Sequence, residues 1–381
     1  MKIGIVCYPT FGGSGVVATE IGMALADNGH QIHFITYRRP ARLNSFHENI
    51  FFHEVNTEDY PLFDYSPYDT ALASKLVDVA LYEKLDLLHV HYAIPHASVA
   101  FLAKSILKSK GIALPVITTL HGTDITLVGN DPSFAPVVEF SINSSDGVTA
   151  VSQQLKQKTL DTFDVKKEIQ VIYNFIDFSR FRKQHKNHFK VAIVPNGEKI
   201  MAHVSNFRKV KRVEDVIKVF AKVQKEIPCK LLLIGDGPER RNLEVMCREL
   251  RLCEDIRFLG KQDAVEELLD ISDLFLIPSE NESFGLAALE AMACEVPVIS
   301  SNAGGLPEVN IHGVTGYLSN VGDVDDMAKN ALAILKDETL HNQLKKGAYE
   351  TALKFHINSI LPQYEAYYTQ VYDEVTAKAL V

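Results

Sequence analysis

Residues 274–293 read LFLIPSENESFGLAALEAMA. The first four residues, Leu274–Ile277, form an apolar run typical of a buried strand, and Pro278 ends it. A polar turn and then an apolar helical pattern follow at 284–293. Because a strand that runs through a turn into a helix is the repeating unit of parallel α/β sheets, this stretch predicts an α/β fold.

Two glutamates in this stretch carry chemical information. Glu282 lies at the expected N-terminal edge of the helix, where a simple helix cap is the alternative reading. Glu290 lies about two turns inside an otherwise apolar helix, where a buried carboxylate needs a partner. The free backbone N–H groups of 283–286 suit a phosphate. Together these features favour a sugar-nucleotide site, with carboxylates accepting hydrogen bonds from hydroxyls.

The same alternation of short apolar runs and longer helical patterns extends over most of the chain. In the first half, strands are expected at 2–7, 31–36, 50–55, 87–91, 115–120, 147–151 and 169–173, and helices at 14–28, 70–84, 96–110, 134–144 and 152–162. After a polar, basic stretch at 177–198, strands are expected at 199–205, 230–235, 256–259, 273–277 and 296–300, and helices at 213–226, 238–251, 263–270, 284–293 and about 338–378, with a bend at Pro362.

Two complete α/β sets predict two doubly wound, Rossmann-like domains that face a central cleft. We expect domains at 1–168 and 169–362, with a C-terminal helix at about 363–381 packing back on the first. In open α/β sheets, ligands bind outside the carboxyl ends of the strands. Most unusual residue clusters of this chain follow predicted strands, which indicates one shared site.

The bulk composition excludes several classes. The 381 residues are 46% hydrophobic and 23% charged, as expected for a globular protein, and the net charge of −9 argues against a nucleic-acid binder. Five scattered cysteines without a CxxC pair predict reduced core thiols rather than structural zinc. The apolar N-terminal run is too short for a signal peptide, and no run is long enough to cross a membrane. We expect a cytoplasmic protein without membrane partners; homo-oligomer formation stays open.

Three clusters follow strands of the first half. The glycine-rich turn 9–17 precedes a helix N-terminus and suits a ligand, although it is not a GxGxxG fingerprint and a tight turn would explain it too. The stretch 89–96 holds three histidines, but no nearby acid or cysteine completes a metal site, so Tyr92 is the better candidate for a substrate contact. His121, beside Gly122, suits a sugar hydroxyl or a structural hydrogen bond.

The second half adds a basic cluster. Residues 203–212 read HVSNFRKVKR, with four basic residues in the last five positions. Such a run is often a solvated face, but directly after a buried strand it suits a diphosphate. Loops 235–238 and 260–263 could line a nucleotide-binding site, and the turn 302–308 could be structural.

These motifs together resemble the retaining glycosyltransferases of family 4, which have the two-domain GT-B fold. The resemblance covers essentially the whole chain and rests on the glutamate pair with its x7 spacing, the GDGP turn at 235–238 and the GGLPE turn at 304–308. The N-terminal half is similar to the members that join N-acetylglucosamine to L-malate in bacillithiol biosynthesis, through its motifs at 7–15, 89–97, 118–126 and 173–177, and the run 205–213 of the second half is equally characteristic.

The resemblance implies transfer of N-acetylglucosamine from UDP-GlcNAc to the hydroxyl of L-malate with retention, giving GlcNAc-α-malate. It implies no cofactor and no metal, since cations of the basic cluster stabilise the departing phosphate. The implied catalytic residues are Arg208, Lys211, Glu282 and His121. The implied donor-binding residues are Gly13, Ser205, Gly235, Lys261, Gln262, Phe284, Gly285, Leu286 and Glu290, and the implied acceptor-binding residues are Ser14, Tyr92, Thr119 and Asn206.

Two departures from the family pattern concern single residues. Arg208 and Lys211 are three positions apart where five is common, which leaves open whether Lys209, Lys211 or Arg212 contacts phosphate. Glu295 replaces a small glycine, and we expect no functional effect. The alternatives are a transferase with another small acceptor, such as inositol phosphate, a UDP-GlcNAc 2-epimerase of the same fold, and a sensor that binds the donor without turnover.

Overall fold

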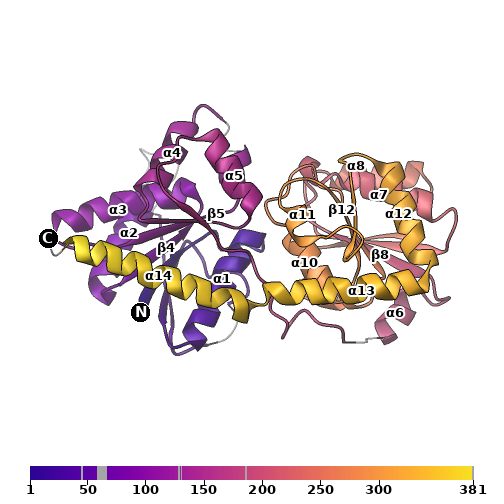
Figure 1. Cartoon of the computed structure of the whole chain (residues 1–381), viewed down its shortest axis with the longest axis horizontal. Helices are drawn as coiled ribbons and strands as arrows, with labels where there is room; N and C mark the ends of the chain where they lie inside the picture. The colour runs from indigo at the N-terminus through magenta and orange to yellow at the C-terminus, as the bar shows by residue number, and fades with distance from the viewer. Residues whose placement is uncertain (44–45, 58–66, 128, 130, 185–186, 380–381) are drawn as a thin grey trace. The chain divides into compact units, whose positions relative to one another are not determined.

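The computed structural model describes residues 1–43, 46–57, 67–127, 129, 131–184 and 187–379. The described residues divide into two compact units: the first comprises Met1–Asn174 with the C-terminal segment from Ile357, and the second comprises Phe175–His356. Each unit is a parallel sheet covered by helices on both faces (Figure 1). The α/β fold expected from the sequence is confirmed.

The first unit holds, among the described residues, a seven-stranded sheet in the order β3-β2-β1-β4-β5-β6-β7. Its strands are β1 (Lys2–Val6), β2 (Gln31–Thr36), β3 (Ile50–Glu54), β4 (Leu87–His91), β5 (Val116–Leu120), β6 (Gly147–Ala150) and β7 (Ile169–Val171). Its helices are α1 (Gly13–Asp27), α2 (Tyr68–Glu83), α3 (Ser98–Ser109), α4 (Ala135–Ser144), α5 (Gln153–Thr162) and α14 (Ile357–Ala379). Every strand pair is parallel, as the continuous apolar strands require.

The second unit holds, within the described part of the chain, a six-stranded sheet in the order β10-β9-β8-β11-β12-β13. Its strands are β8 (Lys199–Val204), β9 (Cys229–Ile234), β10 (Ile256–Gly260), β11 (Leu274–Ile277), β12 (Val298–Ser301) and β13 (Gly316–Ser319). Its helices are α6 (Asn187–Ile193), α7 (Val213–Val223), α8 (Arg240–Glu249), α9 (Val265–Asp270), α10 (Leu286–Ala293), α11 (Leu306–Val309), α12 (Val324–Lys336) and α13 (Glu338–Ala352).

The unit boundaries differ from the expected domain boundary. β7 pairs with β6, so the chain leaves the first sheet only after residue 171, and the first unit extends to Asn174 rather than to 168. At the other end, α14 begins at Ile357 and runs through Pro362 as one helix. The whole of α14 belongs to the first unit.

The region between 301 and 338 holds elements that the sequence analysis missed. β13 is short and only its two end residues are buried, so it lacks a strand signal. α12 is amphipathic and is capped by Asp323, whose side chain accepts a hydrogen bond from the backbone N–H of Asp326. Its apolar face, with Met327 and Ile334, joins the core of the second unit.

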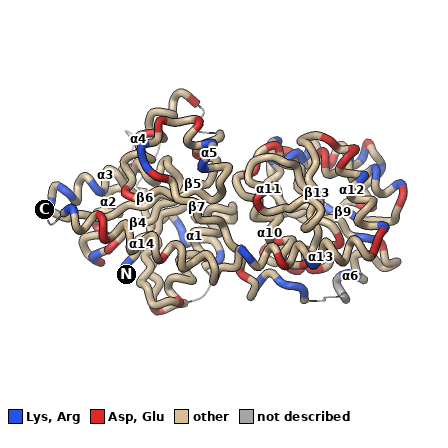
Figure 2. The backbone as a smooth tube through the Cα atoms, viewed as in Figure 1, with Lys and Arg blue, Asp and Glu red and all other residues tan. Residues whose placement is uncertain are grey.

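Charges of both signs are interspersed over both units (Figure 2). Among the described residues, no helix is both long and apolar enough to cross a membrane. All five cysteines lie in the described part of the chain and none forms a disulfide. Four are buried as expected, but Cys253 is exposed, so the prediction of core thiols is wrong for that residue.

Candidate functional site

The strand order of the second unit brings two loops together. β8 and β11 are neighbours in the sheet although two strands, β9 and β10, separate them in sequence. The strand order therefore changes direction between β8 and β11. Ligands of open α/β sheets bind at such a switch point. The loop after β8 carries the basic cluster, the loop after β11 carries Glu282, and the backbone N–H of Glu280 donates to the carbonyl of Val210 at 2.8 Å.

Lys211 and Glu282 form an ion pair across these two loops. The Lys211 Nζ lies 2.9 Å from Oε1 and 2.5 Å from Oε2 of Glu282. The exposed fractions of the two side chains are 20% and 14%, so the pair is partly shielded from solvent. Glu282 lies four residues before α10 and does not cap it, which excludes the helix-cap interpretation.

The other basic residues of the cluster differ in their surroundings. The Arg212 guanidinium is bound to the buried carboxylate of Asp215, with Nε–Oδ2 at 2.7 Å. Arg208 and Lys209 are exposed, and no described residue forms an ion pair with either. Arg208 and Lys209 could therefore form ion pairs with a diphosphate at this edge of the sheet. Lys211 is already paired with Glu282.

Glycines hold both loops against neighbouring turns. A Cβ on Gly304, where φ is +60°, would lie 2.0 Å from the Glu282 carbonyl oxygen, and the N–H of Gly305 donates to that oxygen at 2.7 Å. In the same way, a Cβ on Gly235 would lie 1.8 Å from the carbonyl oxygen of Ser205. Only residues without a side chain fit these close approaches, so the GGLPE and GDGP turns support the loops that carry the candidate residues.

Helix α10 begins at Leu286 behind the glutamate loop. Gly285 precedes it with φ at +101°, and Phe284 is buried with its ring 5.5 Å from that of Phe355. Glu290 is 8% exposed in the second turn of the helix and has a polar partner. The backbone N–H groups at the start of α10 thus lie next to the Lys211–Glu282 pair.

A buried histidine fixes the start of the basic loop. The His203 Nδ1–H donates to the carbonyl of Leu276 at 2.8 Å, and His203 Nε2 lies 2.8 Å from the hydroxyl of Ser205. Burial lowers the pKa of His203 to about 4, so its ring is neutral at pH 7. This role of His203 is not predictable from sequence, because the carbonyl that it binds belongs to the neighbouring strand β11.

Three further predicted residues of the second unit lie on its surface. Asn206, Lys261 and Gln262 are all exposed. The Gln262 side-chain N–H donates to the carbonyl of Leu259 at 2.6 Å, while Lys261 extends from the loop after β10. They border the same carboxyl edge without contacting the Lys211–Glu282 pair.

In the first unit, the corresponding switch point lies between β1 and β4. The turn after β1 leads into α1, and a Cβ on Gly15 would lie 2.4 Å from the Tyr8 carbonyl oxygen. Tyr92 follows β4 with φ at +83°, and its hydroxyl donates to Ser14 Oγ at 2.8 Å. The structure therefore brings Gly13, Ser14 and Tyr92 together at this edge of the sheet.

His121 joins this group from the end of β5. Its Nε2 lies 2.8 Å from His91 Nδ1, and its ring centre lies 5.2 Å from that of Tyr92. Burial lowers the pKa of His121 to about 3. A neutral imidazole at this place can exchange a hydrogen bond with a sugar hydroxyl.

Thr119 does not reach this surface. It is fully buried, and its hydroxyl lies 2.7 Å from His89 Nε2 and 2.7 Å from Thr149 Oγ1. His89 in turn contacts the Tyr368 hydroxyl of α14 at 2.7 Å. The Thr119 hydroxyl is therefore hydrogen-bonded inside the sheet, and the acceptor contact expected of Thr119 stays a prediction.

Asp124 is a residue of this site that sequence reasoning missed. Its carboxylate accepts backbone N–H bonds from Ala93 at 2.9 Å and from Gly122 at 2.9 Å, which ties the turns after β4 and β5 together. Burial raises the pKa of the Asp124 carboxyl to about 6, although these donors act in the opposite direction. Its place two residues after Gly122, close to the end of a predicted strand, was the available signal.

The three histidines of 89–96 make separate contacts. His96 Nδ1 donates to the carbonyl of His91 at 2.6 Å, whereas His91 faces His121 and His89 faces Thr119. Among the described residues they form no set of three ligands around one point.

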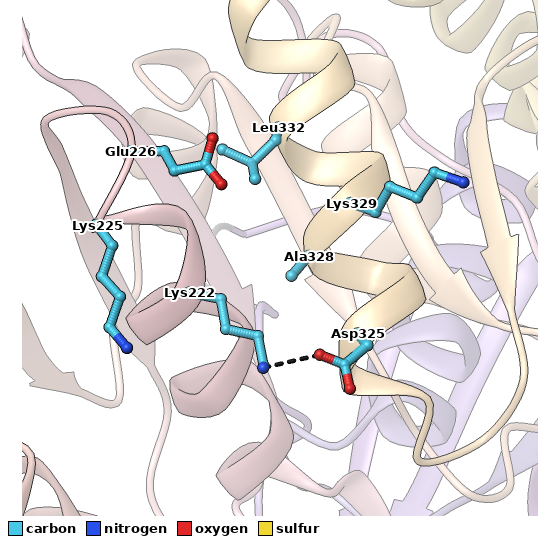
Figure 3. A pocket seen from close by; sticks show the side chains of 7 residues that line it. All are labelled: Lys222, Lys225, Glu226, Asp325, Ala328, Lys329 and Leu332. Carbon is cyan, nitrogen blue, oxygen red and sulfur yellow. Dashed lines mark ion pairs between the residues drawn. The ribbon is translucent and has the colours of Figure 1, made fainter.

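A surface hollow lies between α7 and α12 (Figure 3). Its lining is mostly charged, and Lys222 Nζ forms an ion pair with Asp325 at 2.7 Å. Their side chains are 46% and 86% exposed, as is usual for a solvated face. We assign no role in substrate binding to this hollow.

Comparison with known proteins agrees with this architecture. Two doubly wound units with loops gathered at their switch points define the GT-B class of glycosyltransferase, and two family models match: Glycosyltransferase Family 4 over residues 11–180 and Glycosyl transferases group 1 over residues 184–351. The chain belongs to glycosyltransferase family 4.

Two relatives cover nearly the whole chain. The N-acetyl-alpha-D-glucosaminyl L-malate synthase of Bacillus anthracis is 51% identical over 376 residues, which is 97% of each chain. The D-inositol 3-phosphate glycosyltransferase of Thermobispora bispora is 25% identical, over 96% of this chain and 91% of that protein.

Solved structures share the fold at low identity. Anabaena Alr3699/HepE in complex with UDP and glucose has a TM-score of 0.83 at 22% identity, with 97% of this chain and 99% of that chain covered. Sucrose-phosphate synthase from Thermosynechococcus elongatus has a TM-score of 0.82 at 21% identity, with 98% and 100% covered.

Proposed function

We propose that this enzyme transfers N-acetylglucosamine from UDP-GlcNAc to the hydroxyl of L-malate, giving GlcNAc-α-malate at the first step of bacillithiol biosynthesis. The observation that carries this proposal is the 51% identity to the Bacillus anthracis synthase over 97% of both chains. The arrangement of the carboxyl-edge loops supports it, because each unit presents a separate group of polar residues.

We assign donor binding chiefly to the second unit. Arg208 and Lys211 hold the diphosphate, and the N–H groups of Phe284, Gly285 and Leu286 bind the donor beside them. The carboxylate of Glu282 accepts a hydrogen bond from the sugar. The remaining donor contacts are Glu290 at the ribose and Ser205, Gly235, Lys261 and Gln262 around the nucleotide.

We assign the acceptor to the first unit. Ser14 and Tyr92 bind L-malate, helped by Asn206, whereas the neighbouring Gly13 contacts the donor and His121 positions the donor sugar near its 6-hydroxyl. The 2.8 Å contact between Tyr92 and Ser14 supports a common surface for these groups. Since the Thr119 side chain is buried, only its backbone is available to a ligand.

The reaction is a front-face substitution with retention. As the bond between the anomeric carbon and the UDP oxygen breaks, the malate hydroxyl oxygen bonds to the same face of that carbon. The hydroxyl proton passes to the departing β-phosphate oxygen, whose charge Arg208 and Lys211 stabilise. We propose that these cations replace a metal ion; complete loss of activity in excess chelator, restored by Mg²⁺ or Mn²⁺, would overturn that part.

The experiment that tests the function is incubation with UDP-GlcNAc, with and without L-malate. Products are identified by mass and by the coupling constant of the anomeric proton. We expect malate-dependent release of UDP and an α-linked GlcNAc-malate. Release of UDP without malate, formation of an epimerised sugar, or turnover with inositol phosphate instead of malate would contradict the proposal.

We also place the reaction in the cytoplasm. This is supported by the five cysteines, none of which forms a disulfide.

A further inference from the structure

A cluster of three potential metal ligands lies outside the residues assigned to the substrates. His33 on β2, His53 on β3 and Glu83 at the end of α2 each offer a ligand atom, and these atoms lie within 4.8 Å of one another. The two imidazoles are the closest pair, with His33 Nδ1 3.0 Å from His53 Nε2. The cluster is not predictable from sequence, because its members are 20 and 30 residues apart and form no local motif.

The sheet register explains why the histidines meet. β2 and β3 are parallel, His33 is paired with Phe51, and Ile35 is paired with His53. Side chains two residues apart on a strand share a face, so His33 and His53 are diagonal neighbours on one face of the sheet. Ile35 on that same face packs in one core cluster with Leu76 of α2, which ends at Glu83.

The placement of the two rings suits metal binding. Each ring presents one nitrogen to the other, His33 Nδ1 and His53 Nε2, and an imidazole binds a metal ion through such a nitrogen. His33 is fully buried, and its Nε2 has no hydrogen-bond partner among the described residues. A buried imidazole with one nitrogen lacking a hydrogen-bond partner stabilises the sheet less than an aliphatic side chain would.

The charged side chains around the cluster are of both signs and equal in number. Lys2 acts on His33, and Lys75 and Asp78 act on His53, together with Glu83 itself. The Lys2 ammonium donates to the backbone carbonyl of Glu83 at 2.9 Å rather than to its carboxylate. Two lysines and two acids surround the site, so a divalent ion does not meet an excess of positive charge.

We infer that His33, His53 and Glu83 form a binding site for a divalent transition-metal ion, with Zn²⁺ as the favoured occupant. Imidazole and carboxylate are zinc ligands at about 2.0–2.2 Å, which places tetrahedral donors roughly 3.3 Å apart. The two histidine nitrogens are already near that separation, and the half-buried Glu83 has to approach them. Water supplies the fourth ligand.

The ion stabilises the edge of the first sheet and takes no part in the transfer reaction. β3 is the outermost strand of its sheet, and the three ligands join it to β2 and to the end of α2. An ion that binds the native state and not the unfolded chain raises the stability by mass action.

The test is titration of the untagged, full-length chain with ZnCl₂ in a calorimeter, after removal of metal by dialysis against a chelator. We expect one ion per chain and a higher melting temperature with Zn²⁺. His53→Gln and Glu83→Gln should each weaken binding at least tenfold and remove the Zn²⁺-dependent shift. His47→Gln, a histidine from the β2–β3 connection outside the cluster, should bind as the unaltered chain does.

Three outcomes would overturn the inference: no binding at micromolar Zn²⁺, equal binding by the two cluster variants and the unaltered chain, or an equal loss in His47→Gln. Circular dichroism checks the fold of each variant. Because Glu83 is at a helix end and half-buried, Glu83→Gln keeps the test decisive if His53→Gln fails to fold.

Discussion

Lys211 Nζ lies 2.9 and 2.5 Å from the two carboxylate oxygens of Glu282, across 71 positions of sequence. The pair follows from strand order, because β8 and β11 are neighbours and their loops leave the same edge of the sheet. In the proposed reaction both residues bind the donor. Donor binding therefore exchanges this ion pair for contacts with a phosphate and a sugar hydroxyl.

Replacement of Lys211 by methionine should lower kcat by about 10²–10³-fold, the usual effect of losing a group that stabilises charge in the transition state. The measurement is UDP release at saturating donor and acceptor. Lys209→Met is the matched control, since Lys209 is exposed two positions away, and it should cost only a few-fold. If Lys209→Met is the more damaging variant, Lys209 rather than Lys211 contacts the phosphate.

Acid should destabilise the first unit through its buried histidines. Burial lowers the pKa of His89 to about 3 and of His96 to about 4, below the 6.5 of an unfolded histidine. The unfolded chain therefore binds more protons, and stability falls as the pH drops from 6.5 towards 4, by about 1.4 kcal/mol per pH unit for each histidine. Asp124 acts in the opposite direction. Its pKa is raised to about 6, so below that pH the native state binds a proton more readily than the unfolded chain, which stabilises the native state.

His96→Gln tests this prediction. Glutamine keeps a donor for the His91 carbonyl but does not titrate, so the slope of melting temperature against pH between 6.5 and 4 should become shallower. His312→Gln, on the exposed surface of the second unit, should leave the slope unchanged. An unchanged slope in His96→Gln would mean that its ring is not held neutral in the native state.

Much of this architecture follows from local sequence patterns. β8 and β11 are apolar runs, and each is followed by a polar loop, at 205–212 and 278–285. Because parallel strands end at the same edge of a sheet, it was predictable that these two loops share the carboxyl edge. The E-x7-E spacing also predicted two different environments, and Glu282 lies in a loop while Glu290 is buried in α10. These inferences need only strand ends and helix starts.

Contacts between distant segments could not be predicted in the same way. Thr119 looks like a polar residue at a strand end, yet its hydroxyl is consumed by His89, which is in turn bound by Tyr368 from 279 residues further along the chain. The role of Asp124 depends likewise on where Ala93 lies. Such networks are set by tertiary packing, which no pattern within a segment records.

Tyr368→Phe should destabilise the first unit by about 1–3 kcal/mol, because it leaves His89 Nδ1 buried without a partner. Thermal denaturation measures the effect. Tyr372→Phe on the same helix is the control, since the Tyr372 side chain is half-exposed and no described residue bonds its hydroxyl; its melting temperature should not change. Equal melting temperatures for both variants would show that the hydroxyl of Tyr368 does not hold α14 to the sheet.

Gly304→Ala should damage donor binding without touching a donor-binding side chain. The new Cβ would lie 2.0 Å from the Glu282 carbonyl oxygen, so the glutamate loop has to move. Gly313→Ala separates this clash from backbone strain, since Gly313 also has positive φ, at +76°, but nothing lies within 4 Å of its Cβ position. Left-handed backbone costs a residue with a side chain about 1–2 kcal/mol, so both variants should lose stability. Only Gly304→Ala should raise the dissociation constant for UDP-GlcNAc, by at least tenfold in calorimetry. If both variants bind the donor equally well, the GGLPE turn does not position Glu282.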